Sequence, residues 1–515
     1  MNNPTRRNVL RGGALAAAGL AATVLGASGP AFAAPPASPA DAGAADGRRF
    51  PFLEGAFAPR RREVSAFDLP VTGRLPRALD GRYLRNGPNV LGLEDPKAHH
   101  WMLGAGMVHG LRLRDGRAEW YRSRWVRSAD VAARLGEPYK GPQPPPAEDF
   151  AGNTHVIGHR GRILALQEGG PLPYELDGDL NTVGLCDFDR TLDGSFAAHT
   201  KFDPHTGELH AVTYAIEWDH VRHIVLDRAG HVARTTRVPV ADSPMMHDFA
   251  LTEKYVVLFD NPITFDAEAA RAGAPVPYAW NERHPARVGL LPRGGGSATW
   301  FDIPPFYFSH TLNAYDDGGR VVVDFTRMPA PFEVAGRGLG GPAAAGPPSL
   351  HRWTIDPVHG VVRTELVDDR PQEFPRVNEA YTGRRHRYGY TAASVELFRA
   401  YGPSVGETGV RPGNALVKHD LLRGTTQVQR LPRGADASEP VFVPADRGAV
   451  GPPPSGPARP AEDDGYVLAY VNNPERNATD LVVLAARDFT GEPVARVHLP
   501  VMVPLGFHGS WVPNG

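Results

Sequence analysis

The sequence is poor in cysteine: Cys186 is the only one in a chain of 515 residues. A single thiol excludes an intrachain disulfide and a cluster of thiolate metal ligands. Counting alone leaves a catalytic thiol open. However, Cys186 follows the apolar run VGL and precedes Asp187, a setting that raises the pKa of a thiol rather than lowering it. We therefore expect a buried structural cysteine.

The chain also lacks an excess of charge of one sign. It has 55 Lys and Arg residues against 57 Asp and Glu residues, a net charge of -2. No basic run stands out beyond the N-terminal segment. Nucleic acid and other polyanions are therefore not expected as partners.

The N-terminus lacks the long, strongly apolar run of a membrane anchor, which needs about 20 such residues. Residues 5–11 read TRRNVLR, a twin-arginine pattern, and a stretch rich in Gly and Ala follows over 12–27. The A-x-A cleavage signal AFA comes next. The sequence predicts a twin-arginine signal peptide over 1–33, export from the cytoplasm, and a disordered mature N-terminus over 34–48.

The remaining chain, residues 49–515, has few helical patterns, with one short candidate at 265–272. Short strands joined by turns dominate instead, in keeping with 57 Gly and 51 Pro. An Asp115-Gly116 turn joins two strands, and the turn DPxxG occurs at 203 and again at 356.

The strand pattern is uniform along the chain, which predicts one domain. Two stretches rich in Gly, Ala and Pro, at 330–349 and 445–460, are read as long surface loops because similar strands lie on both sides of each. The chain is too long for one sandwich. We therefore predict an all-β fold, a single β-propeller over 49–515.

Four of the 20 histidines lie in or beside apolar runs, just before or within a predicted strand. They are His199, His247, His310 and His508. A buried imidazole needs a partner for each nitrogen, and a metal on one with a hydrogen bond on the other meets that need. Their wide spacing carries no helical ligand motif. In a propeller, however, distant strands meet at one axis, so these histidines can converge on one ion.

Several segments resemble motifs of the carotenoid cleavage oxygenases. They are residues 81–89 (GRYLRNGPN), 100–110 (HWMLGAGMVHG), 373–378 (EFPRVN), 439–444 (EPVFVP), 462–465 (EDDG) and the four histidine contexts in order, ending in GFHG at 506–509. The resemblance runs from about residue 50 to the C-terminus. The chain departs from the family pattern at Ala105, where an acidic residue is usual, and at Asp316, where a Glu is usual.

The resemblance implies a seven-bladed β-propeller with a loop and helix cap over the site. One iron(II) per subunit would lie on the axis, bound by the four histidines, with Glu168, Glu373 and Glu439 behind them. Four neutral imidazoles leave the 2+ charge uncompensated, and these carboxylates would offset it and fix the imidazole tautomers. The implied reaction is cleavage of a C=C bond by O2 into two carbonyl products, without a separate acid or base.

The resemblance implies an apolar substrate, either a carotenoid or apocarotenoid polyene or, alternatively, a phenolic stilbene. The stilbene cleavers hold a phenolate with Tyr and Lys, and residues 126–131 contain no Lys, which favours a polyene. Phe306, Phe308 and Phe507 are candidates for substrate contact, and peripheral contact with a membrane is a further expectation.

Two other classes remain open. One is a propeller that binds ligands without catalysis. The other is a zinc hydrolase, which normally uses an acidic ligand or base at the metal.

Overall fold

The computed structural model describes residues 50–514 apart from several short gaps. The gaps are 94, 97–98, 142–150, 217, 329–332, 335–336, 339–346, 395–413 and 447–459. The predicted signal peptide and mature N-terminus lie outside the described residues. So does most of each of the two predicted surface loops.

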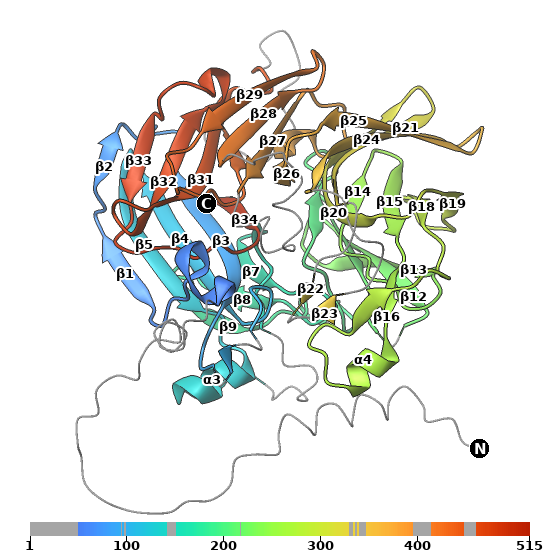
Figure 1. The fold of residues 1–515 in the computed structure, drawn as a ribbon, viewed down its shortest axis with the longest axis horizontal. Coiled ribbons are helices and arrows are strands. Elements are labelled where there is room, and N and C mark those ends of the chain that lie inside the picture. The colour runs from blue at the N-terminus through green and yellow to red at the C-terminus, as the bar shows by residue number, and fades with distance from the viewer. Residues whose placement is uncertain are drawn as a thin grey trace, which may run out of the picture.

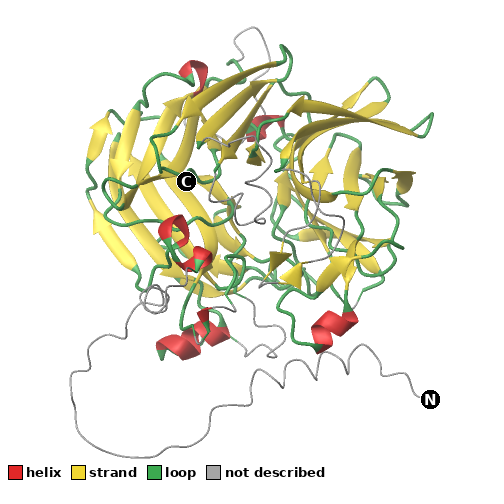
Figure 2. Cartoon of the chain, in the orientation of Figure 1, coloured by secondary structure: helices red, strands yellow, loops and turns green. Residues whose placement is uncertain are grey.

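Seven sheets of four or five antiparallel strands form the described structure and are arranged around one axis (Figure 1). Figure 2 shows strands throughout and only short helices, two of them at the lower edge of the view. The predicted all-β, seven-bladed propeller is confirmed.

Two blades combine strands from both ends of the chain, which closes the ring. Blade 1 orders β1 (Val64–Phe67), β5 (Arg117–Trp125), β4 (Ala105–Arg114), β3 (Gly81–Asn89) and β34 (Gly509–Pro513). Blade 7 orders β2 (Val71–Gly73), β33 (Ala495–His498), β32 (Ala478–Ala485), β31 (Gly465–Asn473) and β30 (Val441–Pro444). The C-terminal β34 is thus the innermost strand of a blade made mostly from the N-terminal part of the chain.

The other five blades are built from consecutive strands. Blade 2 orders β6 (His155–His159), β7 (Arg162–Leu166), β8 (Tyr174–Leu176) and β9 (Thr182–Leu185). Blade 3 orders β10 (Thr200–Phe202), β11 (Leu209–Thr213), β12 (His220–Leu226) and β13 (Val232–Pro239). Blade 4 orders β14 (Phe249–Leu251), β15 (Tyr255–Asp260), β18 (Arg287–Pro292) and β19 (Thr299–Asp302).

Blade 5 orders β20 (Tyr307–Asp317), β21 (Arg320–Met328), β24 (Ser349–Asp356) and β25 (Val361–Asp368). Blade 6 orders β26 (Glu373–Arg376), β27 (Tyr388–Ala393), β28 (Ala415–Asp420) and β29 (Thr425–Arg430). Two small hairpins project from blades 4 and 5: β16 (Ile263–Phe265) with β17 (Tyr278–Trp280), and β22 (Glu333–Val334) with β23 (Arg337–Gly338).

The residues in the hairpin turns explain the backbone conformation of these turns. Asp115 and Gly116 join β4 to β5 with positive φ angles of 51° and 73°, which a two-residue hairpin turn of this twist requires. In the DPxxG turn between β10 and β11, Asp203 accepts a hydrogen bond from the backbone N–H of His205, and Gly207 takes a φ of 73°.

The helices are short and have clear end signals. Ser128 caps α3 (Ala129–Leu135), and Asp266 caps α4 (Ala267–Arg271), the helix predicted within 265–272. The 3₁₀ turns are η1 (Pro51–Leu53), η2 (Gly55–Phe57), η5 (Glu379–Tyr381) and η7 (Ala486–Asp488). In the described part of the chain no helix has the length and apolarity to cross a membrane.

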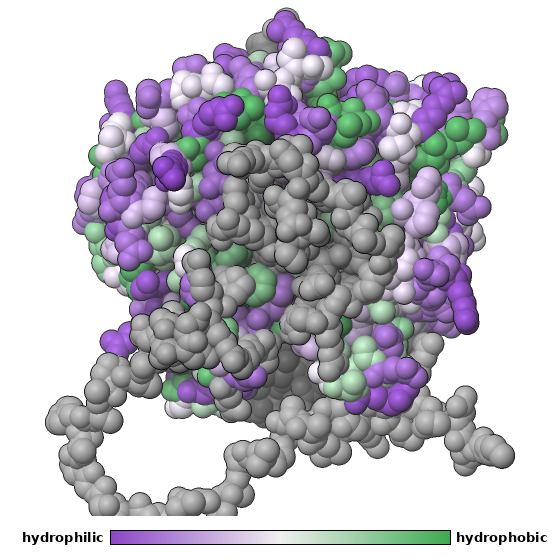
Figure 3. All heavy atoms as spheres, in the orientation of Figure 1, coloured by the Kyte–Doolittle hydropathy of each residue, from purple (hydrophilic) through white to green (hydrophobic). Residues whose placement is uncertain are grey.

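The cores lie between neighbouring blades. Leu111 and Tyr121 of blade 1, for example, pack with Leu468 and Leu481 of blade 7. On the face shown in Figure 3, hydrophilic side chains cover much of the described surface, with hydrophobic ones scattered between them. Cys186 is buried, in agreement with its expected structural role.

Candidate metal centre

One polar residue stands at or near the start of the innermost strand of every blade. In chain order, these residues are His155 (β6), His199 (before β10), His247 (before β14), His310 (in β20), Glu373 (β26), Glu439 (before β30) and His508 (before β34). Several of these strands contact one another around the axis, β34 with β6 and β20 with β14 and β26. The fold thus brings all four predicted histidines together from blades 3, 4, 5 and 1.

The four predicted histidines form a compact cluster. Ligand nitrogens of His199, His247 and His310 lie within 4.8 Å of one another. The ring of His508 lies 4.7 Å from that of His199 and 4.7 Å from that of His310, between centroids. The cluster of His199, His247 and His310 can therefore hold a metal ion.

Each predicted glutamate accepts a hydrogen bond from one imidazole Nδ1. The distances are 2.6 Å from His247 to Glu168, 2.7 Å from His310 to Glu373 and 3.0 Å from His508 to Glu439. Each Nδ1 therefore carries its proton, and in a neutral ring Nε2 keeps a lone pair.

The Nε2 atoms have the environment of metal ligands. Nε2 of His247 lies 3.1 Å from Nε2 of His310, and two lone pairs at that distance cannot hydrogen-bond to each other. Nε2 of His199 is buried without a hydrogen-bond partner. A cation between these nitrogens would satisfy all of them, so the residues present fit a bound metal.

Ligation needs neutral imidazoles, and burial favours the neutral form of two of the four histidines. Burial, with the neighbouring histidines, holds the pKa values of His199 and His508 well below 6.5. Burial also acts to lower the pKa of His247, but the charge and hydrogen bond of Glu168 outweigh it and raise that pKa.

Each glutamate has a further donor that fixes it. Tyr214 donates to Glu168 at 2.6 Å, and Thr326 donates to Glu373 at 2.8 Å. Glu439 accepts from the guanidinium of Arg376 at 3.1 Å and from the backbone N–H of Gly509 at 2.8 Å. The three carboxylates are thus oriented by a phenol, an alcohol and a cation, respectively.

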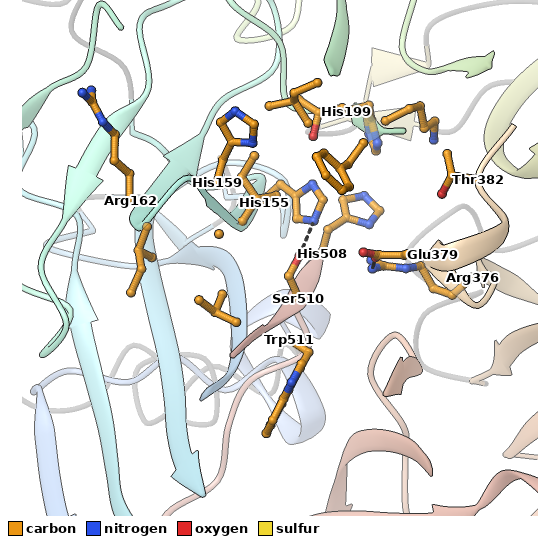
Figure 4. Close-up of a pocket in the computed structure, with 18 of the residues that line it drawn as sticks. His155, His159, Arg162, His199, Arg376, Glu379, Thr382, His508, Ser510 and Trp511 are labelled. Carbon is orange, nitrogen blue, oxygen red and sulfur yellow. Dashed lines mark hydrogen bonds and ion pairs between the residues drawn. The ribbon is translucent and has the colours of Figure 1, made fainter. Parts of the chain in front are cut away.

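His155 also reaches the cluster, although it was not among the histidines selected from the sequence. Its ring lies 5.3 Å from that of His508, and its Nδ1 lies 3.1 Å from the carbonyl oxygen of Ala198. Burial, and then the charge of His508, lowers the pKa of His155 to about 3. Figure 4 shows His155 beside His508, and its ring lies 6.4 Å from that of His199. The only available signal was its place at the start of a predicted strand, which many residues share.

A cavity of about 970 Å³ extends from the histidines along the axis (Figure 4). His199, His310 and His508 line it near the cluster, and Arg82 and Arg160 are among its charged lining residues.

A separate aromatic cluster packs against the histidines. Phe374 lies 5.8 Å from His310 and 5.4 Å from His508 between ring centroids, and Trp101 lies 4.7 Å from Phe507. The segment before β34 is tied to η2 through a hydrogen bond from Leu505 to Ala56.

The three aromatic candidates for substrate contact have different places. Phe507 belongs to the aromatic cluster next to His508. Phe306 does not fit the expected role, because it is 1% exposed and packs against Phe325 and Trp353 in the core between blades 4 and 5. The side chain of Phe308 is outside the described part of the structure.

Comparison with known proteins identifies relatives of this chain. A family model described as retinal pigment epithelial membrane protein matches residues 57–513. A carotenoid cleavage oxygenase of Mycobacterium tuberculosis is 44% identical over 511 residues, covering 90% of this chain and 98% of that protein.

Two solved structures are similar over nearly the whole domain. Lignostilbene dioxygenase of Pseudomonas brassicacearum has a TM-score of 0.76 at 30% identity, covering 90% of this chain and 98% of the other. Cobalt-substituted ACO of Synechocystis, an apocarotenoid oxygenase, has a TM-score of 0.73 at 27% identity, covering 88% and 97%.

Proposed function

This chain belongs to the family of the retinal pigment epithelial membrane protein and the carotenoid cleavage oxygenases, and from that premise we propose that it is an iron(II) dioxygenase. In this proposal His199, His247, His310 and His508 hold one Fe²⁺. The substrate is a carotenoid or apocarotenoid, and O2 cleaves one of its C=C bonds into two carbonyl products. One observation carries the proposal. Nδ1 of His247, His310 and His508 each donates to a carboxylate, and the Nε2 atoms of His247 and His310 point at each other across 3.1 Å.

The protein groups have clear tasks in this reaction. Glu168, Glu373 and Glu439 hold the protons on Nδ1 of three histidines, which keeps the Nε2 lone pairs directed to the ion and offsets its charge. Iron(II), when bound, supplies the activation of O2. Trp101, Phe374 and Phe507 pack together beside the histidines, and in this proposal they would form the apolar wall against which a conjugated chain binds.

The alternative substrate, a phenolic stilbene, is supported by the similarity to lignostilbene dioxygenase. A phenolate needs a cation or strong donor in the site. Residues 126–131 contain no Lys, and their cation Arg127 is already bound by Glu63 and Glu137. The polyene is therefore our first choice.

The substrate test uses purified, iron-loaded protein supplied with an apocarotenal or with 4-hydroxystilbene under ¹⁸O2. We expect two labelled carbonyl products from the apocarotenal, identified by mass spectrometry. His310→Ala is the control that should lose both metal and cleavage. Rapid cleavage of the stilbene alone would overturn the polyene assignment. Stoichiometric zinc with hydrolytic activity, or no bound metal, would overturn the dioxygenase.

We also propose export by the twin-arginine route, supported by the TRRNVLR and AFA segments. Replacing both Arg6 and Arg7 with Lys should retain the precursor in the cytoplasm, as measured by fractionation. The matched control is replacement of Arg11, outside the pair. Because a polyene partitions into lipid, we propose peripheral membrane contact as well, which vesicle flotation of the mature protein would test.

A further inference from the structure

A buried carboxylate, Asp248, lies beside the histidine cluster and is not one of the three glutamates. It follows His247 in the sequence. Its neighbours occupy corresponding places on the adjacent innermost strands: Lys201 is two residues after His199, and Thr311 is one residue after His310. One side chain thus connects the strands that present three of the four histidines.

The connections are direct and short. The ammonium of Lys201 lies 3.0 Å from Asp248 Oδ1. Thr311 donates both its backbone N–H, at 2.9 Å, and its hydroxyl, at 2.8 Å, to Asp248 Oδ2. The Asp248 side chain is only 1% exposed, so these bonds form with little competition from water.

Asp248 differs from the glutamates in how it could act on the metal. Its Oδ1 lies 4.0 Å from Nδ1 of His199, which is too long for a hydrogen bond. It can therefore fix the positions of the ligands through the backbone of β10, β14 and β20, while its charge also acts on His247 through space. Because Lys201 balances its charge, the pair adds no net charge beside the ion.

We propose that Asp248 is a positioning residue that fixes the mutual spacing of His199, His247 and His310. The inference rests on the proposed metal ligation by these histidines. The geometry supplies the reason: the ligand nitrogens of these three residues lie within 4.8 Å of one another, and small shifts of three separate strands would change that spacing. A carboxylate bonded to the two flanking strands holds them in one arrangement.

The test measures Co²⁺ affinity by chelator competition and records the visible absorption of the bound cobalt. Asp248→Asn should weaken binding by about 10- to 100-fold and shift the cobalt bands, as loss of an outer support does at other metal sites. Thr311→Val should weaken binding less. Combined with Asp248→Asn it should add little, because both changes remove the same interaction.

Asp260→Asn is the matched control. Asp260 is equally buried, carries bonds to His284 and Arg287 on the same blade, and does not line the axial cavity. It should lower stability without changing cobalt affinity or absorption. Equal loss of affinity in this control would show a general effect of buried carboxylates and would overturn the proposal.

The outcomes separate this inference from the proposed function. If His310→Ala loses cobalt while Asp248→Asn binds it as the wild type does, the ligand assignment stands and the positioning role is wrong. If His310→Ala still binds cobalt like the wild type, the proposed metal site itself fails. Should Asp248→Asn not fold, Thr311→Val decides: weakened binding with shifted bands supports the role, and unchanged binding overturns it.

Discussion

Tyr214 donates its phenolic hydrogen to the same oxygen of Glu168 that accepts the Nδ1 proton of His247, and both distances are 2.6 Å. Burial and the charge of Glu168 raise the pKa of Tyr214 well above 10, so the phenol stays protonated and remains a donor. A residue of blade 3 therefore orients a carboxylate of blade 2 that orients a histidine of blade 4.

Tyr214→Phe should weaken metal binding, but by less than Glu168→Gln, because Glu168 keeps its bond to His247. We expect Glu168→Gln to weaken metal binding by about 10- to 100-fold, which is the usual effect of losing an outer partner of a metal ligand. Chelator competition measures both. Tyr278→Phe, a buried tyrosine whose ring lies 6.2 Å from that of Tyr214, is the control and should bind metal normally. An equal effect of both tyrosine changes would contradict the prediction.

Glu439→Gln should reduce the metal content of the protein more than Glu379→Gln does, although both remove an acidic partner of Arg376. Glu439 also accepts from His508, whereas Glu379 contacts Arg376 at the partly exposed edge of the site. Gln at this position has one acceptor oxygen for the three donors His508, Arg376 and the backbone N–H of Gly509, and it lacks the buried charge that balances Arg376. Metal content per subunit should fall for the first variant and stay normal for the second.

The strand pattern and the ordered motifs predicted the fold, and the family resemblance named four histidines and three glutamates, which make three His–Glu contacts in the structure. The sequence could not indicate which histidine contacts which glutamate, since each His–Glu contact joins residues of different blades. Asp248 and His155 were missed for the same reason: their significance lies in contacts with strands distant in the sequence. Phe306 was misread because closeness to His310 in sequence does not decide which face of a blade a side chain occupies.

His155 is expected to support the site without binding metal. His155→Phe keeps an aromatic ring but removes the hydrogen bond to Ala198, which should lower the free energy of unfolding by about 0.5–1.5 kcal/mol. Metal stoichiometry should remain one per subunit, in contrast to His508→Ala. Elemental analysis alongside urea denaturation checks both points. Loss of metal from a folded His155→Phe protein would make His155 a ligand and refute the prediction.

Replacing Phe306 and replacing Phe507 should have different effects, the first on stability and the second on substrate binding. Phe306→Ala empties part of a core and should destabilise the protein by about 3–5 kcal/mol, with little change in KM of the remaining folded enzyme. Phe507→Ala should instead raise KM for an apolar substrate, since Phe507 belongs to the aromatic cluster beside His508. Thermal unfolding and steady-state kinetics measure the two effects. A raised KM for Phe306→Ala at normal stability would reverse the assignment.

His284 should make stability depend on pH in a defined direction. Burial acts to lower its pKa, but hydrogen bonds and charges from Asp260 and Asp242 outweigh burial and hold the pKa above 6.5. Because the folded pKa exceeds the unfolded one, the stabilisation is fully present below pH 6.5 and is lost as the pH rises through the folded value. The other histidines titrate alike in wild type and variant, so their contributions cancel in a comparison with His284→Gln. The difference in free energy of unfolding between the two metal-free proteins should therefore be larger at about pH 6 than at about pH 9. A difference that stays constant, or grows with pH, would mean that His284 is neutral in the folded protein.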